Sequence, residues 1–402
     1  MLKDYQGALQ DLDEANVLLP NNAFILVILS HVHWHLNNYR LALECLNKVD
    51  VDESDDYFIF QYNKKWLKWL SDEYQPIIES LQFNSNVKSF TFDELVTKND
   101  SRKRLGQGLY GIVYEGNWEG KKIAIKILKG VDGSFNEGAK KSFISEVRTL
   151  GSIRHINLVQ LLGYCIEGEG HALVYEYMSK SSLDKWLFDD KLNHFLNWHE
   201  RMHIIIGIAK GLAFLHQCNP IILHLDIKPQ NILLDIDYTP KLADFGLARL
   251  LDGEQCQGNL SSTSTPGTSP YMAPEVHLLH QVSTKSDVYS FGVLLIEIVS
   301  GKKTFNVEGE NVSLRDFTKW AKSNYVEGEF EDILDGVLNN SIVDLNHNEA
   351  QKLMKIALEC IQVIGLKVEI LVKTMKLYEI GKATWPCKHV GKIEKPCFPY
   401  QN

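Results

Sequence analysis

A short segment of the chain combines a carboxylate, a cation and an amide at close spacing. It runs from His224 to Asn231 and reads His-Leu-Asp-Ile-Lys-Pro-Gln-Asn. Its Asp226 could take a proton from a hydroxyl group, Lys228 could offset charge on a transferring phosphate, and Asn231 could bind a metal ion. Thirteen residues after Asn231, Asp244 opens an Asp-Phe-Gly triplet, and its carboxylate could chelate a Mg²⁺ ion that bridges phosphates. These residue types at this spacing predict transfer of a phosphoryl group.

A glycine-rich segment lies upstream of these residues, from Leu105 to Val113. Its pattern is G-x-G-x-x-G-x-V, and the three glycines are Gly106, Gly108 and Gly111. Glycines let a β-hairpin approach phosphates closely because they carry no Cβ atom. Taken alone, the glycines fit a plain tight hairpin equally well. The β-type sequence that follows them favours a phosphate-binding loop.

A lysine and a glutamate farther along could complete the phosphate site. Lys126 lies in an apolar, strand-like run, where an unpaired charge is costly. Its predicted role is to contact the α- and β-phosphates, and the alternative is a solvent-facing strand lysine. Twenty residues later, Glu146 falls on a helical pattern and is the predicted partner that holds Lys126 in place.

The motifs follow one another in a characteristic order, and Ala273-Pro274-Glu275 closes a segment rich in hydroxyl groups. With this set of motifs, residues 92 to about 362 resemble the protein kinases. They resemble the plant receptor-like and Pelle-type serine/threonine kinases more closely, and four further segments carry that likeness: 174–178 (VYEYM), 196–198 (LNW), 286–292 (SDVYSFG) and 356–360 (IALEC).

The resemblance implies an α+β two-lobed kinase fold, with an N-lobe over about 100–178 and a C-lobe over about 179–362. It implies ATP as the phosphate donor and Mg²⁺ as the metal, which Mn²⁺ could replace. The residues expected to act in catalysis are Asp226, Lys228, Lys126, Glu146 and Thr268, and those expected to bind metal are Asn231 and Asp244. The residues expected to bind ATP are Leu105, Gly106, Gly108, Gly111, Val113, Ala124, Lys126, Tyr175, Glu176, Met178 and Leu233.

Within that set, the resemblance assigns separate roles around the adenine. Val113, Ala124 and Leu233 would sandwich the ring, Tyr175 would be the gatekeeper, and residues 176–178 would be the hinge whose backbone hydrogen-bonds to adenine. A stacked regulatory column linking the lobes would contain Leu150, Leu161, Phe245, His224 and Asp287. That column makes His224 a structural histidine, and the alternative is a catalytic one.

The acceptor is expected to be a serine or threonine hydroxyl. Lys228, two residues after Asp226, is the serine/threonine pattern of the family, whereas tyrosine kinases usually carry Ala-Ala-Arg or Arg-Ala-Ala there. By the same resemblance, Thr268 would bridge Asp226 and Lys228. The alternative function is a catalytically weak, kinase-like scaffold or adaptor.

The sequence departs from the family before the catalytic aspartate. Leu225 stands where most kinases have an arginine that pairs with a phosphate on the activation loop. A leucine cannot form that pair, so phosphorylation of the loop loses its main electrostatic anchor. The hydroxyl residues 261–265 (SSTST) remain candidate phosphorylation sites, and we expect activity not to depend strongly on them.

A second departure is at the C-terminus. The family pairs the glutamate equivalent to Glu275 with a downstream arginine, but the last arginine of this chain is Arg315. A buried carboxylate left without its partner would cost about 3–5 kcal/mol of stability. Lys367 or Lys373 could substitute with poorer geometry. Residues 363–402 are predicted to form an atypical tail, with a lysine-rich helix from about Leu366 to Ile380.

The first sixty residues contain a repeat. Four positions recur 34 residues apart, in the pairs Tyr5/Tyr39, Ala8/Ala42, Leu9/Leu43 and Leu12/Leu46. This is the period of tetratricopeptide repeats, which are pairs of antiparallel helices that bind partner proteins. The alternative is two unrelated amphipathic helices. We therefore expect an all-α, tetratricopeptide-like docking region over 1–81 and a linker over 82–99. Such arrays need about three units for stability, so either residues 57–81 supply a degenerate packing helix or the array is incomplete.

Bulk properties restrict the function further. The net charge of −9 argues against a broad nucleic-acid-binding surface, which needs a basic excess.

The seven cysteines are scattered and odd in number, which favours free thiols in a reducing compartment. Cys387, His389 and Cys397 match no common zinc spacing. No apolar run is long enough to span a bilayer, so we expect a cytoplasmic protein that reaches membranes only through partners.

Overall fold

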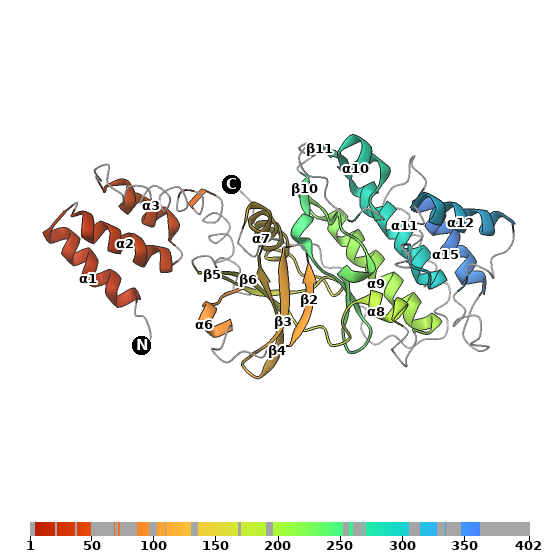
Figure 1. Ribbon diagram of the computed structural model, residues 1–402, viewed down its shortest axis with the longest axis horizontal. Coiled ribbons are helices and arrows are strands. Elements are labelled where there is room, and N and C mark those ends of the chain that lie inside the picture. The colour runs from red at the N-terminus through yellow and green to blue at the C-terminus, as the bar shows by residue number, and fades with distance from the viewer. Residues whose placement is uncertain are drawn as a thin grey trace. The chain divides into compact units, whose positions relative to one another are not determined.

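The computed structural model describes seventeen stretches of the chain: 5–20, 22–36, 38–49, 68, 71–72, 87–95, 103–108, 110–129, 136–167, 170–189, 196–251, 257–259, 268, 271–304, 314–327, 334 and 347–361 (Figure 1). The predicted tail over 363–402, the candidate phosphorylation sites at 261–265 and nearly all of the predicted helix within 57–81 lie outside these residues. The chain divides into two compact units, residues 1–152 with 161–175 and residues 153–160 with 176–402.

Three helices come first in the chain: α1 (Tyr5–Leu18), α2 (Ala23–His35) and α3 (Tyr39–Asn47). The two copies of the repeated motif lie on α1 and α3, and α2 packs against both helices. The core between them contains Leu26, Leu29, Ala42 and Leu46, which are all nearly inaccessible. The small Ala42 is fully buried, as expected of a residue that lets neighbouring helices approach closely.

The first unit also contains a β-sheet with the strand order β1-β5-β6-β4-β3-β2. Strands β2 and β3, β3 and β4, and β5 and β6 pair antiparallel, whereas β1 and β5 run parallel. Helix α7 accompanies this sheet in the same unit (Figure 1). The elements are β1 (Lys88–Ser89), α6 (Phe92–Leu95), β2 (Arg104–Gly108), β3 (Gly111–Trp118), β4 (Lys121–Leu128), α7 (Glu137–Leu150), β5 (Leu161–Glu167) and β6 (Gly170–Glu176).

The prediction of a linker over 82–99 is wrong for residues 87–95. The N–H of Phe90 donates to Tyr164 O at 2.8 Å, and the Phe90 and Leu95 side chains are buried in the apolar cluster of the sheet. A Cβ atom on Gly163 would lie 2.3 Å from the Phe90 ring, so the glycine makes room for it. Burial of this aromatic ring stabilises the segment by about 2 kcal/mol. Residues 87–95 therefore pack onto the sheet, and β1 within them is one of its strands.

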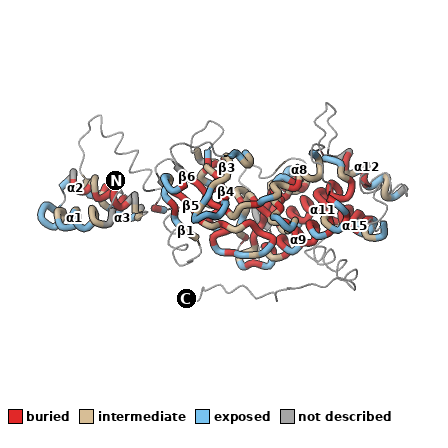
Figure 2. The backbone as a smooth tube through the Cα atoms, turned by 90° about the horizontal axis from the view of Figure 1, so that it is seen from below, coloured by how far each residue is buried: buried red, intermediate tan, exposed pale blue. Residues whose placement is uncertain are grey.

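The second unit is mainly helical. Its helices are α8 (Leu183–Phe188), α9 (Trp198–Gln217), α10 (Pro274–Leu279), α11 (Thr284–Ser300), α12 (Leu314–Glu327) and α15 (His347–Cys360). Its short strands and 3₁₀ turns are β7 (Ile221–Leu223), η2 (Pro229–Asn231), β8 (Ile232–Leu234), β9 (Pro240–Leu242), η3 (Phe245–Leu247), β10 (Arg249–Leu251), β11 (Gln257–Asn259) and β12 (Gln281–Ser283). Figure 2 shows the buried residues gathered in α9, α11 and α15. The described part of the chain thus has a mixed α/β architecture, with a β-sheet in the first unit and mainly helices in the second.

The two central helices begin and end at residues suited to those positions. Asn197 and Glu200 form a capping box at the start of α9, each side chain accepting the other's backbone N–H at 2.8–2.9 Å. Helix α11 ends at Gly301, whose φ of 64° suits a glycine. The buried Arg201 of α9 donates to Ile298 O of α11 at 2.6 Å. Helix α11, which carries a key support of the site, is therefore fixed at its C-terminal end.

In the part of the chain that the structure describes, no helix is both long and apolar enough to cross a membrane.

Candidate active site

In the first unit, Lys126 and Glu146 form an ion pair. Lys126 lies on β4 opposite Val113 of β3, and Glu146 lies on α7. Both side chains are buried, Lys126 with 6% and Glu146 with 0% of its surface exposed. Glu146 also accepts hydrogen bonds from the hydroxyl of Tyr175 and, at 3.3 Å, from Ser142 Oγ. The buried charge on Lys126 is thereby compensated, which explains why the lysine can lie on an apolar strand.

In the second unit, three side chains meet around Asp226. Lys228 Nζ lies 2.8 Å from Asp226 Oδ2, and Thr268 Oγ1 donates to Asp226 Oδ1 at 2.8 Å. Lys228 Nζ in turn donates to Thr268 Oγ1 at 2.7 Å, so Thr268 lies between the two charged groups. Asn231 Nδ2 donates to both Asp226 Oδ2 and Asp226 O, at 2.7 and 2.8 Å. This network fixes the orientation of a carboxylate that could receive a hydroxyl proton.

The backbone before Asp226 is fixed by a buried carboxylate of α11. Asp287 accepts the backbone N–H of His224 at 2.9 Å and that of Leu225 at 2.8 Å, and His216 Nε2 lies 2.9 Å from the same carboxylate. Burial alone would raise the pKa of Asp287, but the hydrogen bond and charge of His216 outweigh it and hold that pKa below its usual value. These bonds hold Leu225 at a φ of 64°, a strained value for a leucine.

His224 has no spare ring nitrogen for proton transfer. Its Nε2 lies 3.1 Å from Ala243 O, and its Nδ1 accepts the backbone N–H of Asp226 at 3.3 Å. Its ring packs on Phe245 with the centroids 4.6 Å apart. Because the ring is completely buried, the pKa of His224 lies below its usual value and the ring is neutral. This geometry supports the structural reading of His224 over the catalytic one.

The two predicted metal ligands lie on adjacent segments. The N–H of Ala243, next to Asp244, donates to Asn231 O at 2.9 Å. The Asn231 amide group uses its nitrogen to bond Asp226, and its Oδ1 has no partner among the described residues. Asp244 adopts a left-handed backbone conformation with φ 64° and ψ 72°. An amide oxygen and a carboxylate are the hard oxygen ligands that Mg²⁺ prefers, so these residues fit that ion.

The predicted hinge supplies a backbone donor. The N–H of Glu176 is already bonded to Gln160 O at 3.1 Å, whereas the N–H of Met178 has no partner in the described part of the chain. The Glu176 side chain accepts from Gln160 N at 2.8 Å and from Lys241 Nζ at 2.9 Å. Met178, rather than Glu176, therefore offers the N–H that an adenine ring requires.

The remaining predicted nucleotide-binding residues lie on strands. Gly106 has no atom within 4 Å of the place where a Cβ would stand, so its surroundings are open. A Cβ on Gly111 would lie 2.7 Å from Ile127 O, so only glycine fits there. Leu105, Gly106 and Gly108 lie on β2, Gly111 and Val113 on β3, Ala124 on β4 and Leu233 on β8.

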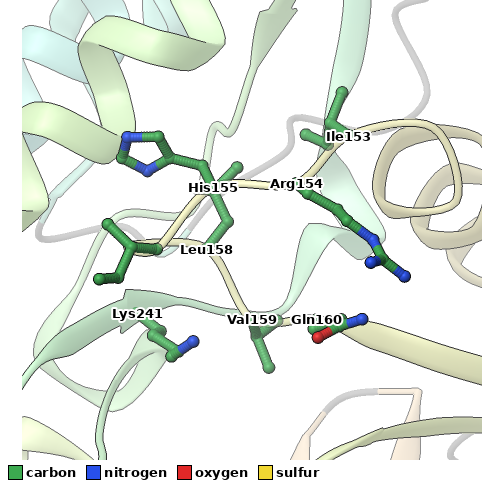
Figure 3. A pocket seen from close by; sticks show the side chains of 8 residues that line it. Ile153, Arg154, His155, Leu158, Val159, Gln160 and Lys241 are labelled. Carbon is green, nitrogen blue, oxygen red and sulfur yellow. The ribbon is translucent and has the colours of Figure 1, made fainter. Parts of the chain in front are cut away.

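A pocket of about 320 Å³ lies elsewhere, and Figure 3 shows the side chains around it. It is lined by residues 153–156, 158–160 and Lys241, none of which belongs to the predicted site. His155 in this pocket stacks on Phe214, and burial with the charges of nearby lysines lowers its pKa to about 4. His155 is therefore neutral at physiological pH.

Leu225 lies in an apolar environment. It belongs to a buried cluster with residues from the segment between Asp244 and Glu275, here called the activation segment, and from the helices and strands beside it. The other members are Leu223, Leu251, Tyr271, Ala273, Val276, Val282, Tyr289 and Val293. The activation segment also pairs through β10 with β7 and through β11 with β12. The position of the usual arginine is thus an apolar anchor for this segment.

The predicted stability penalty at Glu275 is wrong in its premise. A cost of about 3–5 kcal/mol applies to a carboxylate that is fully buried and has no partner. Glu275 is only half-buried, and its Oε1 accepts a hydrogen bond from Ser286 Oγ at 3.3 Å. Partial access to water and a hydroxyl donor compensate the charge in part, so the penalty falls well below that of a buried unpaired charge. The candidate replacements Lys367 and Lys373 lie outside the described residues.

Sequence reasoning missed two residues that support the site. His216 contacts Asp287 from the last turn of α9, and Ser142 contacts Glu146 one helical turn away on α7. Ser142 could have been found from its i to i+4 spacing before Glu146. His216 sits in an apolar helix and gives no comparable signal.

Comparisons with known proteins agree with this geometry. Residues 100–363 match the family described as protein tyrosine and serine/threonine kinase. The G-type lectin S-receptor-like serine/threonine-protein kinase SD2-5 of Arabidopsis thaliana is 43% identical over 267 residues, which are 66% of this chain and 31% of that protein. Cysteine-rich receptor-like protein kinase 36 of the same plant is 43% identical over 285 residues, 70% of this chain and 40% of that protein.

A third Arabidopsis thaliana relative, the probable L-type lectin-domain containing receptor kinase S.5, is 39% identical over 298 residues, 72% of this chain and 44% of that protein. The chain spans less than half the length of these relatives. The predicted resemblance to the protein kinases, and among them to the plant receptor-like serine/threonine kinases, is confirmed. The chain belongs to the protein tyrosine and serine/threonine kinase family.

Proposed function

We propose that this chain transfers the γ-phosphate of ATP to serine or threonine hydroxyls of protein substrates, as a step in signalling. The observation that carries the proposal is Thr268 Oγ1, which lies 2.8 Å from Asp226 Oδ1 and 2.7 Å from Lys228 Nζ. A hydroxyl group already fits between the base and the cation, and a substrate hydroxyl needs the same two contacts.

Asp226 is the proposed base. Its carboxylate orients the substrate hydroxyl and takes the proton late, because the transition state of phosphoryl transfer is loose. Lys228 offsets the charge that develops on the transferred group. Since little covalent chemistry is asked of the protein, fixed positions are its main contribution. The bonds from Asn231 and Thr268 provide that fixation at Asp226.

The nucleotide is proposed to be held at both of its ends. Lys126 binds the α- and β-phosphates, and Glu146 keeps the lysine in place. The glycine-rich loop, with Leu105, Gly106 and Gly108, covers the phosphates. Val113, Ala124 and Leu233 contact the adenine ring, Tyr175 acts as gatekeeper, and Glu176 to Met178 form the hinge. Among these, the Met178 N–H supplies the adenine hydrogen bond.

Mg²⁺, or Mn²⁺ in its place, would be held by Asn231 Oδ1 and the Asp244 carboxylate. When bound, the ion neutralises phosphate charge and aligns the oxygens of the transferred group. The free Oδ1 of Asn231 supports this assignment, because the amide nitrogen is already committed to Asp226.

We propose that activity does not require phosphorylation of residues 261–265. The burial of Leu225 among Leu251 and Tyr271 supports this, since apolar contacts tie the activation segment to the loop before Asp226. No phosphate is needed for such an anchor.

The first three helices are proposed to be tetratricopeptide-like repeats, with residues 1–81 as a docking region for a partner protein or peptide. The 34-residue spacing and the packing of α2 against α1 and α3 support this interpretation.

A cytoplasmic location, with membranes reached through partners, is proposed as well. Free thiols at Cys45, Cys165, Cys218 and Cys360 are compatible with a reducing compartment.

The test is phosphate incorporation from labelled Mg-ATP by the purified full chain, compared with Asp244→Asn. The proposal predicts incorporation by the wild type and a loss of at least about tenfold in the variant, since one metal ligand is weakened. Equal incorporation by both proteins would refute the active-enzyme reading and favour the scaffold alternative.

A further inference from the structure

The aromatic residue at the tip of the glycine-rich hairpin lies against the first turn of α7. Tyr110 directly precedes Gly111, and its ring faces Gly138, the second residue of α7. A Cβ atom built on Gly138 would lie 2.5 Å from Tyr110 Cε1, 3.0 Å from Cζ and 3.2 Å from the hydroxyl oxygen. Contacts under 3.0 Å do not occur for real Cβ atoms. The ring therefore occupies space that any side chain at position 138 would need.

The helix itself gives no reason for a glycine at this position. Gly138 lies within a helix and is not among the glycines with positive φ, so its backbone conformation is open to any residue. A glycine inside a helix costs up to about 1 kcal/mol relative to alanine. The start of α7 is capped by Asn136, whose side chain accepts the N–H of Ala139 at 3.1 Å. The packing of Tyr110 is the feature that a glycine at position 138 permits.

Among the described residues, those near the tip of the hairpin are largely exposed. Gln107 and Gly108 are exposed, and Gly106 has open space where a side chain would stand. The Lys129 N–H donates to Tyr110 O at 3.1 Å, which anchors the backbone of the tip to the end of β4. The half-buried Tyr110 ring adds an anchor to α7, the helix that also carries Glu146.

We infer that Tyr110 is a positioning residue that fixes the tip of the glycine-rich loop to α7. Through this contact a single helix holds both the loop and, by way of Glu146, the phosphate-binding Lys126. Freeing the ring would leave the loop backbone poorly placed to bind phosphates, so the KM for ATP would rise. The inference rests on the proposed function, because it assigns the loop to ATP.

The test uses four variants of the full chain: Gly138→Ala, Tyr110→Ala, the double variant and Tyr110→Phe. Alanine is a better helix former than glycine, so Gly138→Ala does not endanger the fold of α7. We expect Gly138→Ala and Tyr110→Ala each to raise the KM for ATP about tenfold with a smaller change in kcat, since small misplacements near reacting groups are costly. Tyr110→Phe keeps the ring and should keep the wild-type KM.

The double variant provides the decisive comparison. If Gly138→Ala acts by displacing the ring, it has no further effect once the ring is gone, and the double variant matches Tyr110→Ala. Lys141→Ala, an exposed change on the same helix, is the control and leaves the KM unchanged. An unchanged KM in Gly138→Ala, or effects that multiply in the double variant, would overturn the inference.

The affinity for ATP, measured by titration calorimetry on the same variants, separates this inference from the proposed function. A wild type that binds ATP without turning it over contradicts the proposed function only. The pattern of affinities across the variants then still supports or overturns the role of Tyr110.

Discussion

The hydroxyl of Tyr175 donates a hydrogen bond to Glu146 Oε2, while Lys126 pairs with Oε1 of the same carboxylate. The proposed gatekeeper therefore acts on the ion pair as well as bordering the adenine site. Since all three side chains are buried, this hydroxyl helps to fix the position of Lys126.

Tyr175→Phe is predicted to loosen the ion pair. A hydrogen bond to a charged group contributes about 1.5–3 kcal/mol, and a loss of 1.4 kcal/mol corresponds to a factor of about ten. We expect kcat/KM for ATP to fall by about tenfold, measured by steady-state kinetics. Tyr164→Phe is the matched control, because Tyr164 is a buried tyrosine of the same sheet whose hydroxyl interacts with Ser89. An equal effect of the two changes would show that general packing, and not the bond to Glu146, is responsible.

Thr268 provides a test of the network around Asp226. Thr268→Ala removes the hydroxyl that bonds both Asp226 and Lys228, and kcat is expected to fall by about 10–100-fold, from the energy of one or two charge-assisted bonds. Thr268→Ser keeps the hydroxyl and should stay within about threefold of the wild type. Single-turnover kinetics of the three proteins make the comparison. A serine variant as impaired as the alanine variant would contradict a role for the hydroxyl.

Alanine replacement of all five residues 261–265 is predicted to leave most of the kinase activity. The apolar cluster around Leu225 holds the activation segment without a phosphate. Kinase assays on the purified variant check this prediction. A collapse of activity would show that phosphorylation of these residues is required.

The same cluster predicts that Leu225→Arg destabilises the protein. The variant would place a charge among apolar side chains without a partner. We expect the free energy of unfolding to fall by about 3 kcal/mol or more. Leu225→Met keeps the apolar volume and should cost less than about 1.5 kcal/mol. Denaturant unfolding of both variants measures the difference, and equal stability of the two would contradict a fully apolar setting for Leu225.

Some of these relationships follow from local sequence and others do not. Asp226, Lys228 and Asn231 lie within six residues, so their spacing alone indicated that they act together. The bond from Tyr175 to Glu146 joins residues 29 apart and depends on how the sheet and α7 pack. The burial of Phe90 likewise depends on Gly163, which lies 73 residues away on β5 and has no side chain, so that the ring can pack against its backbone. Motif spacing carries no information on such long-range packing.

Glu297 is predicted to make stability depend on pH. Burial raises the pKa of this carboxyl to about 7, from an ordinary value of 4.5, although Thr304 and the Tyr271 hydroxyl donate to it. The folded state then binds its proton more tightly than the unfolded state. This contribution to stability is complete below pH 4.5 and is lost as the pH rises through 7.

Glu297→Gln removes that titration while keeping a group of the same shape. The free energy of unfolding of the wild type, relative to the variant, is expected to fall between pH 4.5 and pH 7 and to level off above it. Urea denaturation across this range measures the difference. A difference that stays constant, or that grows with pH, would show that Glu297 is ionised in the folded state.

The identity of the phosphorylated amino acid is the sharpest test of the proposed transfer of phosphate to serine and threonine. The purified full chain is incubated with labelled Mg-ATP and a generic protein substrate, and the label is analysed after acid hydrolysis of the protein. The account predicts phosphoserine and phosphothreonine with the wild type and neither with Asp226→Asn, which cannot accept the hydroxyl proton. Phosphotyrosine alone, or equal labelling by both proteins, would contradict it.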